Sequence, residues 1–327
     1  TMGYGVETME KKSNEGSAEF HGAPMKEEDA KQELAKIPSL EELTKAYEPF
    51  RSELMKRSKG MPKASTALEG PAKIARTITD KKGGARKDFG AVHIKAFMAK
   101  DHRVVVLHGD LAGSGGFDSV EKEFPDRVIN CGAAEANMYM VGAGLRQSGM
   151  LPVTYTFAAF GTNDARANAR LIDVNCGHVP CAVLHDCTHS GLSVGEDGET
   201  HQDRNYLNIP FDHTQVWMPA DSNQAAAAAE RGLELVAEGN TNVYVFTARS
   251  NHEQLKTPKG DIIYGKDYVF DGSMDLLHGS GDSTDTATII ACGIPVHDAL
   301  AAAHMFKEEK KKTVRVLNAA CVRPLDA

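Results

Sequence analysis

Two histidines and an aspartate occur within thirteen residues of the chain: His189, Asp197 and His201. Three glycines, at positions 191, 195 and 198, separate them and permit tight backbone turns that could bring the side chains together. The segment follows an apolar run typical of a buried strand, which is where open α/β sheets place their ligand sites. The pattern fits a ligand-binding loop, and on composition alone it fits an exposed polar loop equally well.

Three shorter segments also carry candidate groups. Glu135 stands where an apolar run meets a helical pattern, a place where the helix dipole favours a carboxylate. Phe157 and Phe160 are three residues apart at the end of another run, which suits either a core or an aromatic platform. Asp110 and Ser114 lie in a glycine-rich turn after a further run. Each of these segments, taken alone, is weak evidence for a site.

The elements that would position these residues form an α/β pattern. Val-rich runs predict short buried strands at 104–107, 128–130, 153–157, 179–184 and 243–247. Helical patterns between several of them predict helices at 134–147, 164–174 and 223–237. Buried strands that alternate with helices indicate a parallel sheet.

The flanking segments suggest the domain organisation. We expect residues 1–84 to form an extended tail, a helix at 40–59 and a linker, and residues 85–250 to form the main α/β domain. Residues 251–275 read as a second linker. Residues 276–327 read as an incomplete C-terminal α/β domain, with strands at 287–292 and 314–317 and a helix at 297–310.

Composition excludes several classes of function. The formal charge of −8 over 327 residues argues against a nucleic-acid binder, although a few arginines suffice for a small anionic substrate. No apolar run reaches about 18 residues and no secretory signal is present, so we expect no membrane association. Cys131, Cys181 and Cys292 lie in or beside apolar runs, where a reduced cysteine behaves as a small hydrophobe, so we expect a reducing compartment and infer the cytoplasm. The six cysteines match no zinc pattern, and a cluster of Cys176, Cys181 and Cys187 with His185 is disfavoured, so we predict no metal site.

Read in order, these segments resemble the transketolase family. Residues 195–202 (GEDGETHQ) are similar to its signature loop, and residues 188–190 (THS) stand before that loop at the usual distance. The likeness continues through residues 84–86, 216–221 and 248–249 of the pyrimidine-binding domain. Residues 1–5 and 21–26 resemble the end of the family's diphosphate-binding domain, and residues 292–297 resemble the start of its C-terminal domain.

The resemblance implies a thiamine diphosphate site. Thiamine enzymes form a carbanion at C2 of the thiazolium ring, and a carboxylate at N1′ of the pyrimidine favours the imino tautomer that removes the C2 proton. That carboxylate maps to Glu135, Phe157 and Phe160 would pack on the pyrimidine, and Asp110 would lie near the cofactor. Asn163 stands where the family often has a third aromatic residue.

The resemblance also implies a sugar phosphate substrate. Phosphate recognition maps to Arg86, Ser114, His189 and Arg249, while Asp197 would accept a hydrogen bond from a donor-sugar hydroxyl. His201 would polarise the carbonyl, so that Glu135, His189 and His201 are the expected catalytic residues, and His21 would line the pocket from the other side. The expected reaction is that of transketolase in the pentose phosphate pathway, the transfer of a two-carbon ketol unit from a ketose phosphate to an aldose phosphate.

One departure from the family affects what the chain can do. The motif GDG followed by Asn, which holds Mg²⁺ and the diphosphate in this superfamily, does not occur in the sequence. We therefore expect the chain to be a part of the enzyme that is inactive alone and is completed by a homodimer partner or by a separate diphosphate-binding chain.

Three alternatives stay open: 1-deoxyxylulose-5-phosphate synthase, the β subunit of a 2-oxo acid dehydrogenase, and a non-catalytic transketolase-like binding protein. Thr188 and His189 ahead of the loop favour transketolase over the first two. The combination of Glu135, His201 and Arg249 argues against the third.

Overall fold

The computed structural model describes residues 6–14, 25–60, 67–192, 194–202, 209 and 211–325. Residues 1–63 and 64–327 form two separate compact units. Within the described residues, no helix combines the length and the apolar character needed to cross a membrane.

The first unit contains three helices, α1 (Glu7–Asn14), α2 (Glu27–Ala35) and α3 (Leu40–Gly60). The predicted helix at 40–59 is confirmed, and a reciprocal capping box between Ser39 and Glu42 begins it. The expected extended tail is corrected, because α1 and α2 lie within it. The Thr8 hydroxyl donates to the Glu33 carboxylate over 2.5 Å and so joins these two helices.

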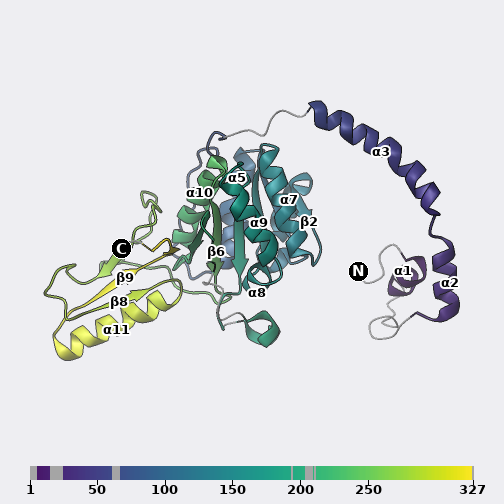
Figure 1. Ribbon diagram of the computed structural model, residues 1–327. Helices are drawn as coiled ribbons and strands as arrows, with labels where there is room; N and C mark the ends of the chain where they lie inside the picture. Colours follow the sequence, from purple (N-terminus) through teal and green to yellow (C-terminus); the bar gives the residue numbers. More distant parts are fainter. Residues whose placement is uncertain are drawn as a thin grey trace. The chain divides into compact units, whose positions relative to one another are not determined.

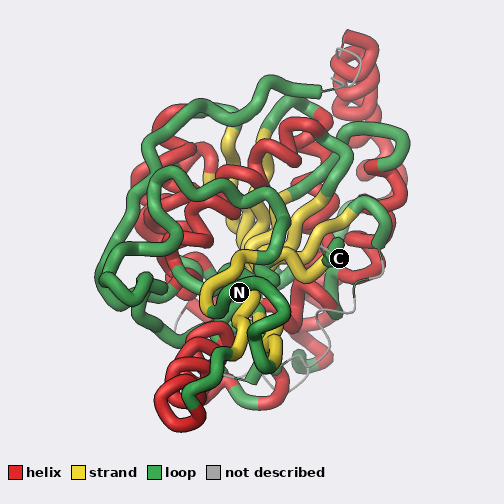
Figure 2. Tube along the Cα trace, turned by 90° about the vertical axis from the view of Figure 1, so that its left-hand side faces the viewer, coloured by secondary structure: helices red, strands yellow, loops and turns green. Residues whose placement is uncertain are grey.

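The second unit is built on a seven-stranded sheet with the order β10-β5-β6-β4-β3-β1-β2. Figures 1 and 2 show the strands of this unit with helices around them. Six strands are parallel: β1 (Val104–His108), β2 (Val128–Asn130), β3 (Leu151–Phe157), β4 (Leu184–Thr188), β5 (Thr214–Trp217) and β6 (Asn242–Thr247). The seventh, β10 (Cys321–Arg323), pairs antiparallel with β5. The predicted α/β fold with a mostly parallel sheet is confirmed.

Helices cover both faces of this sheet (Figure 1). One face packs on η1 (Phe89–Ile94), α5 (Lys95–Lys100) and α10 (Ser222–Glu238), with Phe97, Val106 and Leu233 in the shared core. The other packs on α7 (Glu135–Gln147) and α9 (Arg166–Cys176), with Met138, Ile172 and Val183 in that core. Shorter helical segments are α4 (Ala85–Asp88), η2 (Ala112–Ser114), α6 (Asp118–Glu123), η3 (Pro125–Arg127), α8 (Ala158–Thr162), η4 (Gly195–Asp197) and η5 (Glu199–His201).

The strand predicted at 179–184 is placed wrongly. The observed strand β4 begins at Leu184 and includes His185 and Asp186, both fully buried. His185 stacks on Tyr139 with ring centroids 4.0 Å apart, and its Nδ1 lies 2.7 Å from the Thr154 hydroxyl. Polar residues inside a strand hide its apolar signal, and tertiary contacts of this kind are not visible in a local pattern.

The C-terminal residues form a second sheet of three strands, β7 (Asp275–His278), β9 (Val314–Asn318) and β8 (Ala287–Ala291), with helix α11 (Pro295–Lys310). The sequence predicted the strands β8 and β9 and the helix α11, but it did not predict β7 or β10. The expected linker at 251–275 packs into the unit, since Leu255 and Tyr264 are buried. Because β10 joins the seven-stranded sheet, the C-terminal segment is less separate from the main α/β domain than the sequence predicted. The domain boundaries themselves stay a prediction.

Candidate functional site

Most of the predicted site residues follow the carboxyl ends of neighbouring strands. Asp110 comes after β1, Glu135 after β2, His189 after β4 and Arg249 after β6, while Phe157 ends β3. These strands are adjacent in the sheet order β6-β4-β3-β1-β2. Since parallel strands end at the same edge, the topology alone brings residues from 110 to 249 to one side of the domain.

Glu135 is the first residue of α7 and is buried, with 9% of its surface exposed. The hydroxyl of Thr156, on β3, donates to its Oε1 over 3.1 Å. Gly109 lies against the same carboxylate, where an added Cβ would come within 2.8 Å of Oε1. A buried acid is therefore held at the sheet edge, and a side chain at position 109 would force its carboxylate to shift.

An aromatic cluster adjoins the sheet edge. The rings of Phe157 and Phe160 lie 5.9 Å apart between centroids and nearly parallel, at 15°. His189 lies 3.9 Å from Phe157, and His201 lies 5.0 Å from Phe160 in an edge-on arrangement. The structure thus brings together four predicted residues from β3, α8, the end of β4 and η5.

His189 has a strained backbone and a neutral ring. Its φ of 58° lies in the left-handed region, which is unusual for a residue other than glycine. Burial, followed by the positive charge of Arg86, lowers its pKa to about 4. Its Nδ1 lies 2.9 Å from the hydroxyl of Thr188. Strain of this kind concentrates at functional sites, and at neutral pH the uncharged ring can donate through one nitrogen and accept through the other.

Asp110 is the second residue with a left-handed backbone at this edge, with φ of 62°. It is exposed, and the side chain of Asn130 donates to its Oδ1 over 2.8 Å. Asn130 also accepts from the backbone of Gly132. The ends of β1 and β2 are therefore fixed to each other by side chains beside Glu135.

Arg249 makes an ion pair within the site. Its Nη1 and Nη2 donate to the two carboxylate oxygens of Glu196 over 3.0 and 2.7 Å, and Nη1 also donates to the Val194 carbonyl. A carboxylate oxygen of Asp197 lies 3.8 Å away. The predicted phosphate-binding arginine thus already holds an anionic group of its own chain.

Arg86, on α4, is half-buried and donates to the backbone carbonyl of Ser114. Burial lowers its pKa, and its Nε has no hydrogen-bond partner among the described residues. Asp186, on β4, is fully buried, and within the same part of the chain neither of its carboxyl oxygens has a partner. Burial raises the pKa of Asp186, and the positive charge of Arg86 offsets part of that rise.

Asn163 supplies no aromatic wall. Its side-chain amide donates to the carbonyl of Ala159, 2.9 Å away and one turn earlier.

His21 lies outside the described residues. Among the described residues, no group of three or more His, Cys, Asp or Glu side chains could hold a metal, and Cys176 and Cys181 face each other with sulfurs 3.5 Å apart.

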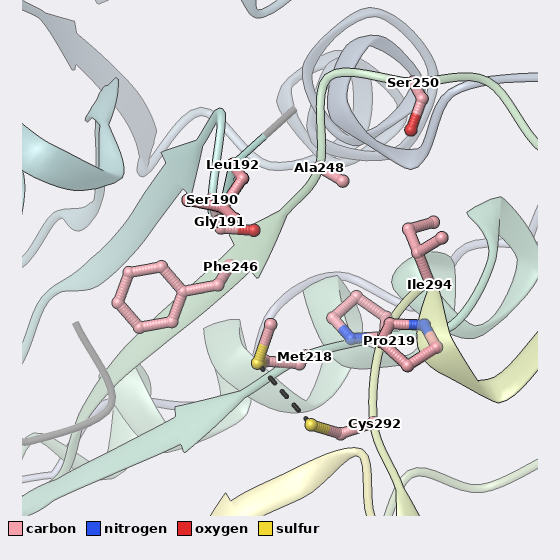
Figure 3. Close-up of a pocket in the computed structure, with 12 residues that line it drawn as sticks. Ser190, Gly191, Leu192, Met218, Pro219, Phe246, Ala248, Ser250, Cys292 and Ile294 are labelled. Carbon is pink, nitrogen blue, oxygen red and sulfur yellow. Dashed lines mark hydrogen bonds between the residues drawn. The ribbon is translucent and has the colours of Figure 1, made fainter. Parts of the chain in front are cut away.

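A cavity of about 390 Å³ opens at the same edge of the sheet (Figure 3). It lies between the carboxyl ends of β4, β5 and β6 and the turn before α11, where the Cys292 thiol contacts the Met218 sulfur at 3.7 Å. Its lining is residues 190–192, 218, 219, 246, 248, 250 and 292–295. None of the predicted site side chains that the structure describes lines it, so the candidate site is defined by contacts around Glu135 and Arg249 instead of by this cavity.

Four residues of the site were not predicted: Thr156, Asn130, Glu196 and Asp186. Thr156 and Asn130 hold predicted residues in place, and Glu196 lies inside the motif that drew attention to Asp197. Glu196 and Arg249 are 53 positions apart, so only the fold reveals their pairing. Asp186 lies beyond the strand predicted at 179–184, so the sequence offered no signal for its burial.

Comparison with known proteins decides the family. The model of the "Transketolase, pyrimidine binding domain" matches residues 88–254, more than half of the chain. The chain belongs to the transketolase family. The model of the "Transketolase, C-terminal domain" matches residues 281–327.

Transketolases are also among the relatives of similar sequence. The chain is 33% identical to rat transketolase and 32% identical to human transketolase over 252 residues, covering 74% of this chain and 36% of each relative. The chain thus spans about a third of the length of these curated relatives. It is 29% identical to the putative transketolase C-terminal section of Methanocaldococcus jannaschii, covering 74% of this chain and 72% of that protein.

Solved transketolase structures share the fold. A split gene transketolase, described as an inactive beta4 tetramer, is 28% identical with a TM-score of 0.59, covering 75% of this chain and 74% of that one. The transketolase from Leishmania mexicana has a TM-score of 0.65 at 22% identity, covering 78% and 37%.

Proposed function

We propose that this chain supplies the pyrimidine-binding half of a thiamine diphosphate site in a transketolase. The observation that supports this most is the buried carboxylate of Glu135 beside the aromatic cluster at the carboxyl edge of the sheet. As part of the complete enzyme, the chain would serve the transfer of a two-carbon ketol unit from a ketose phosphate to an aldose phosphate.

The residues present fit thiamine diphosphate. Its aminopyrimidine needs a carboxylate partner and an apolar, aromatic surface, and Glu135 and the half-exposed ring of Phe160 offer these. Phe157 is buried beneath His189, so it supports the platform from within. When bound, the cofactor would supply a nucleophilic carbon for attack on the donor carbonyl.

The chain's own groups would control protons and orientation. Glu135 would hold a proton shared with the pyrimidine ring, and Thr156 would keep the carboxylate directed at it. His189, neutral at pH 7, and His201, in contact with Phe160, would hydrogen-bond the oxygens of the substrate. Asp110 would support the same edge through its bond with Asn130.

A sugar phosphate would be recognised by the positive charges at this edge. Arg86 and Arg249 would bind the phosphate with help from Ser114 and His189, and Asp197, 3.8 Å from Arg249, would accept a hydrogen bond from a donor hydroxyl.

The diphosphate and Mg²⁺ would be held by another domain, since the sequence has no GDG-to-Asn motif. That domain would come from a homodimer partner or from a separate chain. The split gene transketolase whose beta4 tetramer is inactive offers a parallel for a chain that needs a partner. We further propose a cytoplasmic protein of the pentose phosphate pathway.

Thermal unfolding in the presence of thiamine diphosphate and Mg²⁺ tests this proposal without turnover. We expect a small shift for the chain alone and a rise of several degrees when a transketolase N-terminal section is added. The Glu135→Gln variant should show a reduced rise. Equal stabilisation of wild type and variant would remove Glu135 from the cofactor site.

A further inference from the structure

The guanidinium of Arg249 is occupied by a carboxylate of its own chain. Glu196 pairs with it in a two-pronged geometry, with N–O distances of 2.7 and 3.0 Å. The geometry has the form by which arginine binds a phosphate, with two parallel hydrogen bonds to two oxygens of one anion. Any phosphate that reaches Arg249 therefore meets a group that already fills the same position.

The carboxylate is placed so that it can leave. The Glu196 side chain is 80% exposed, whereas that of Arg249 is 30% exposed, so the acid is the outer member of the pair. It is carried on η4, between glycines 195 and 198, both of which have a positive φ. Exposed ion pairs contribute little to the free energy of unfolding, so opening this one costs the fold little.

Glycine at 195 is needed for the contact itself. A Cβ at this position would collide with the Arg249 guanidinium. The backbone of the loop thus approaches the arginine closely, and the Val194 carbonyl accepts from the same Nη1. The loop is built to reach Arg249 with its backbone as well as with the Glu196 carboxylate.

We propose that Glu196 is an internal competitor, which occupies Arg249, yields to a phosphate dianion and so sets how tightly this edge of the sheet binds a phosphate. This rests on the proposed role of Arg249 in phosphate binding. A phosphate dianion carries about twice the charge of the carboxylate and can also be attracted by Arg86, so it replaces Glu196 at Arg249. A neutral sugar lacks this charge and leaves the pair closed.

The charged neighbours of Arg249 also affect how tightly a phosphate would bind there. Asp197 lies 3.8 Å from Arg249 and repels a phosphate, while Arg86 contributes a positive charge that lowers the pKa of His189. The hydrogen bonds from Arg249 lower the pKa of Glu196 to about 2, so the carboxylate is charged at neutral pH and competes in full.

Phosphate binding by the full chain tests the proposal with Glu196→Gln and a matched control. Glu199→Gln removes the same charge from the same loop, at an exposed position that lies outside the Arg249 pair. We would titrate inorganic phosphate and glycerol phosphate by calorimetry at pH 7.5, with glycerol as the uncharged probe. Glu196→Gln should bind both phosphates about threefold to tenfold more tightly, Glu199→Gln less than twofold, and neither should alter glycerol binding.

Two outcomes would overturn the proposal. Equal gains in both variants would show a general charge effect, and weaker phosphate binding in Glu196→Gln would show that the carboxylate supports the site instead of competing for it. Glu196→Ala serves as a second variant, and thermal unfolding confirms that each variant is folded. Arg249→Ala tests the phosphate site separately from the competition by Glu196. If this variant binds phosphate as tightly as wild type, Arg249 does not form the proposed phosphate site.

Discussion

The Thr156 hydroxyl donates to the Glu135 carboxylate over 3.1 Å, although 21 positions separate the two residues. Thr156 lies on β3 and Glu135 begins α7, so the bond joins a strand to the helix that precedes it in the chain. One buried carboxylate oxygen is thereby oriented by the protein itself. This arrangement places a fixed acid where the proposed cofactor pyrimidine would need one.

In a complete enzyme, Glu135→Gln should lower kcat by about 10²–10⁴-fold while KM for the donor changes little, because the amide cannot share a proton with the pyrimidine ring. Steady-state kinetics with saturating cofactor would measure this. Thr156→Val is the matched variant, since it removes the orienting hydroxyl and keeps the acid, and a loss of about tenfold or less is expected. A Glu135→Gln enzyme within about threefold of wild type would exclude the carboxylate from the mechanism.

Arg249→Ala should impair phosphorylated ketose donors by about tenfold to a hundredfold in kcat/KM, since charge-assisted hydrogen bonds contribute roughly 1.5–3 kcal/mol. Hydroxypyruvate, a short donor without phosphate, should be nearly unaffected. Comparing both donors in wild type and variant isolates the phosphate contribution. Equal losses on both donors, together with lower thermal stability, would instead indicate a structural arginine and would reopen the 2-oxo acid dehydrogenase hypothesis.

Asp186→Asn should stabilise the chain at pH 7 by on the order of 1–3 kcal/mol. Burial raises the pKa of Asp186, so the folded state keeps its proton while the unfolded chain ionises above about pH 4. The cost of Asp186 therefore grows as pH rises, and the gain in the variant should vanish near pH 3.5. Denaturant unfolding at the two pH values measures the difference.

The exposed Asp110→Asn variant is the control for Asp186, because it removes the same charge from an exposed position. It should show no comparable gain at pH 7. If Asp186→Asn destabilises the chain at pH 7 and not near pH 3.5, Asp186 is ionised in the folded protein and makes a stabilising interaction, which would contradict the prediction.

Acid should destabilise the second unit between about pH 6.5 and 4. Burial lowers the pKa of His93 to about 4 and that of His185 to about 3, so both are neutral in the folded state and gain protons on unfolding. Because these folded pKa values are depressed, stability is lost as pH falls below the unfolded value near 6.5. Denaturant unfolding at several pH values, followed by the fluorescence of the buried Trp217, would measure how the free energy of unfolding changes with pH. His185→Gln should reduce this change, whereas the exposed His102→Gln should leave it unaltered.

The sequence predicts the parallel sheet and its main helices because apolar runs and helical periodicity are local. It fails where tertiary contacts override local pattern. β4 contains His185 and Asp186, which read as polar but are enclosed by the fold, and β10 is a strand only because it pairs with β5. The segment 251–275 reads as a linker, yet Leu255 and Tyr264 are buried by neighbours distant in sequence.

Candidate site residues could be named from motifs, and their convergence on one sheet edge follows from the order of the parallel strands. The side chains that hold these candidate residues in place could not be predicted from the sequence. Asn130 on Asp110 and Glu196 on Arg249 are pairs that require three-dimensional proximity. Their absence from a sequence-based prediction is expected, because no local signal distinguishes a paired surface acid from a solvated one.

Thiamine diphosphate-dependent ketol transfer, measured after mixing this chain with a transketolase N-terminal section, tests the central claim most directly. We predict no turnover by the verified 327-residue chain alone, turnover on mixing, and loss of that turnover when Glu135→Gln replaces the wild-type chain. Ketol transfer by the chain alone, or equal turnover with the Glu135→Gln chain, would contradict it.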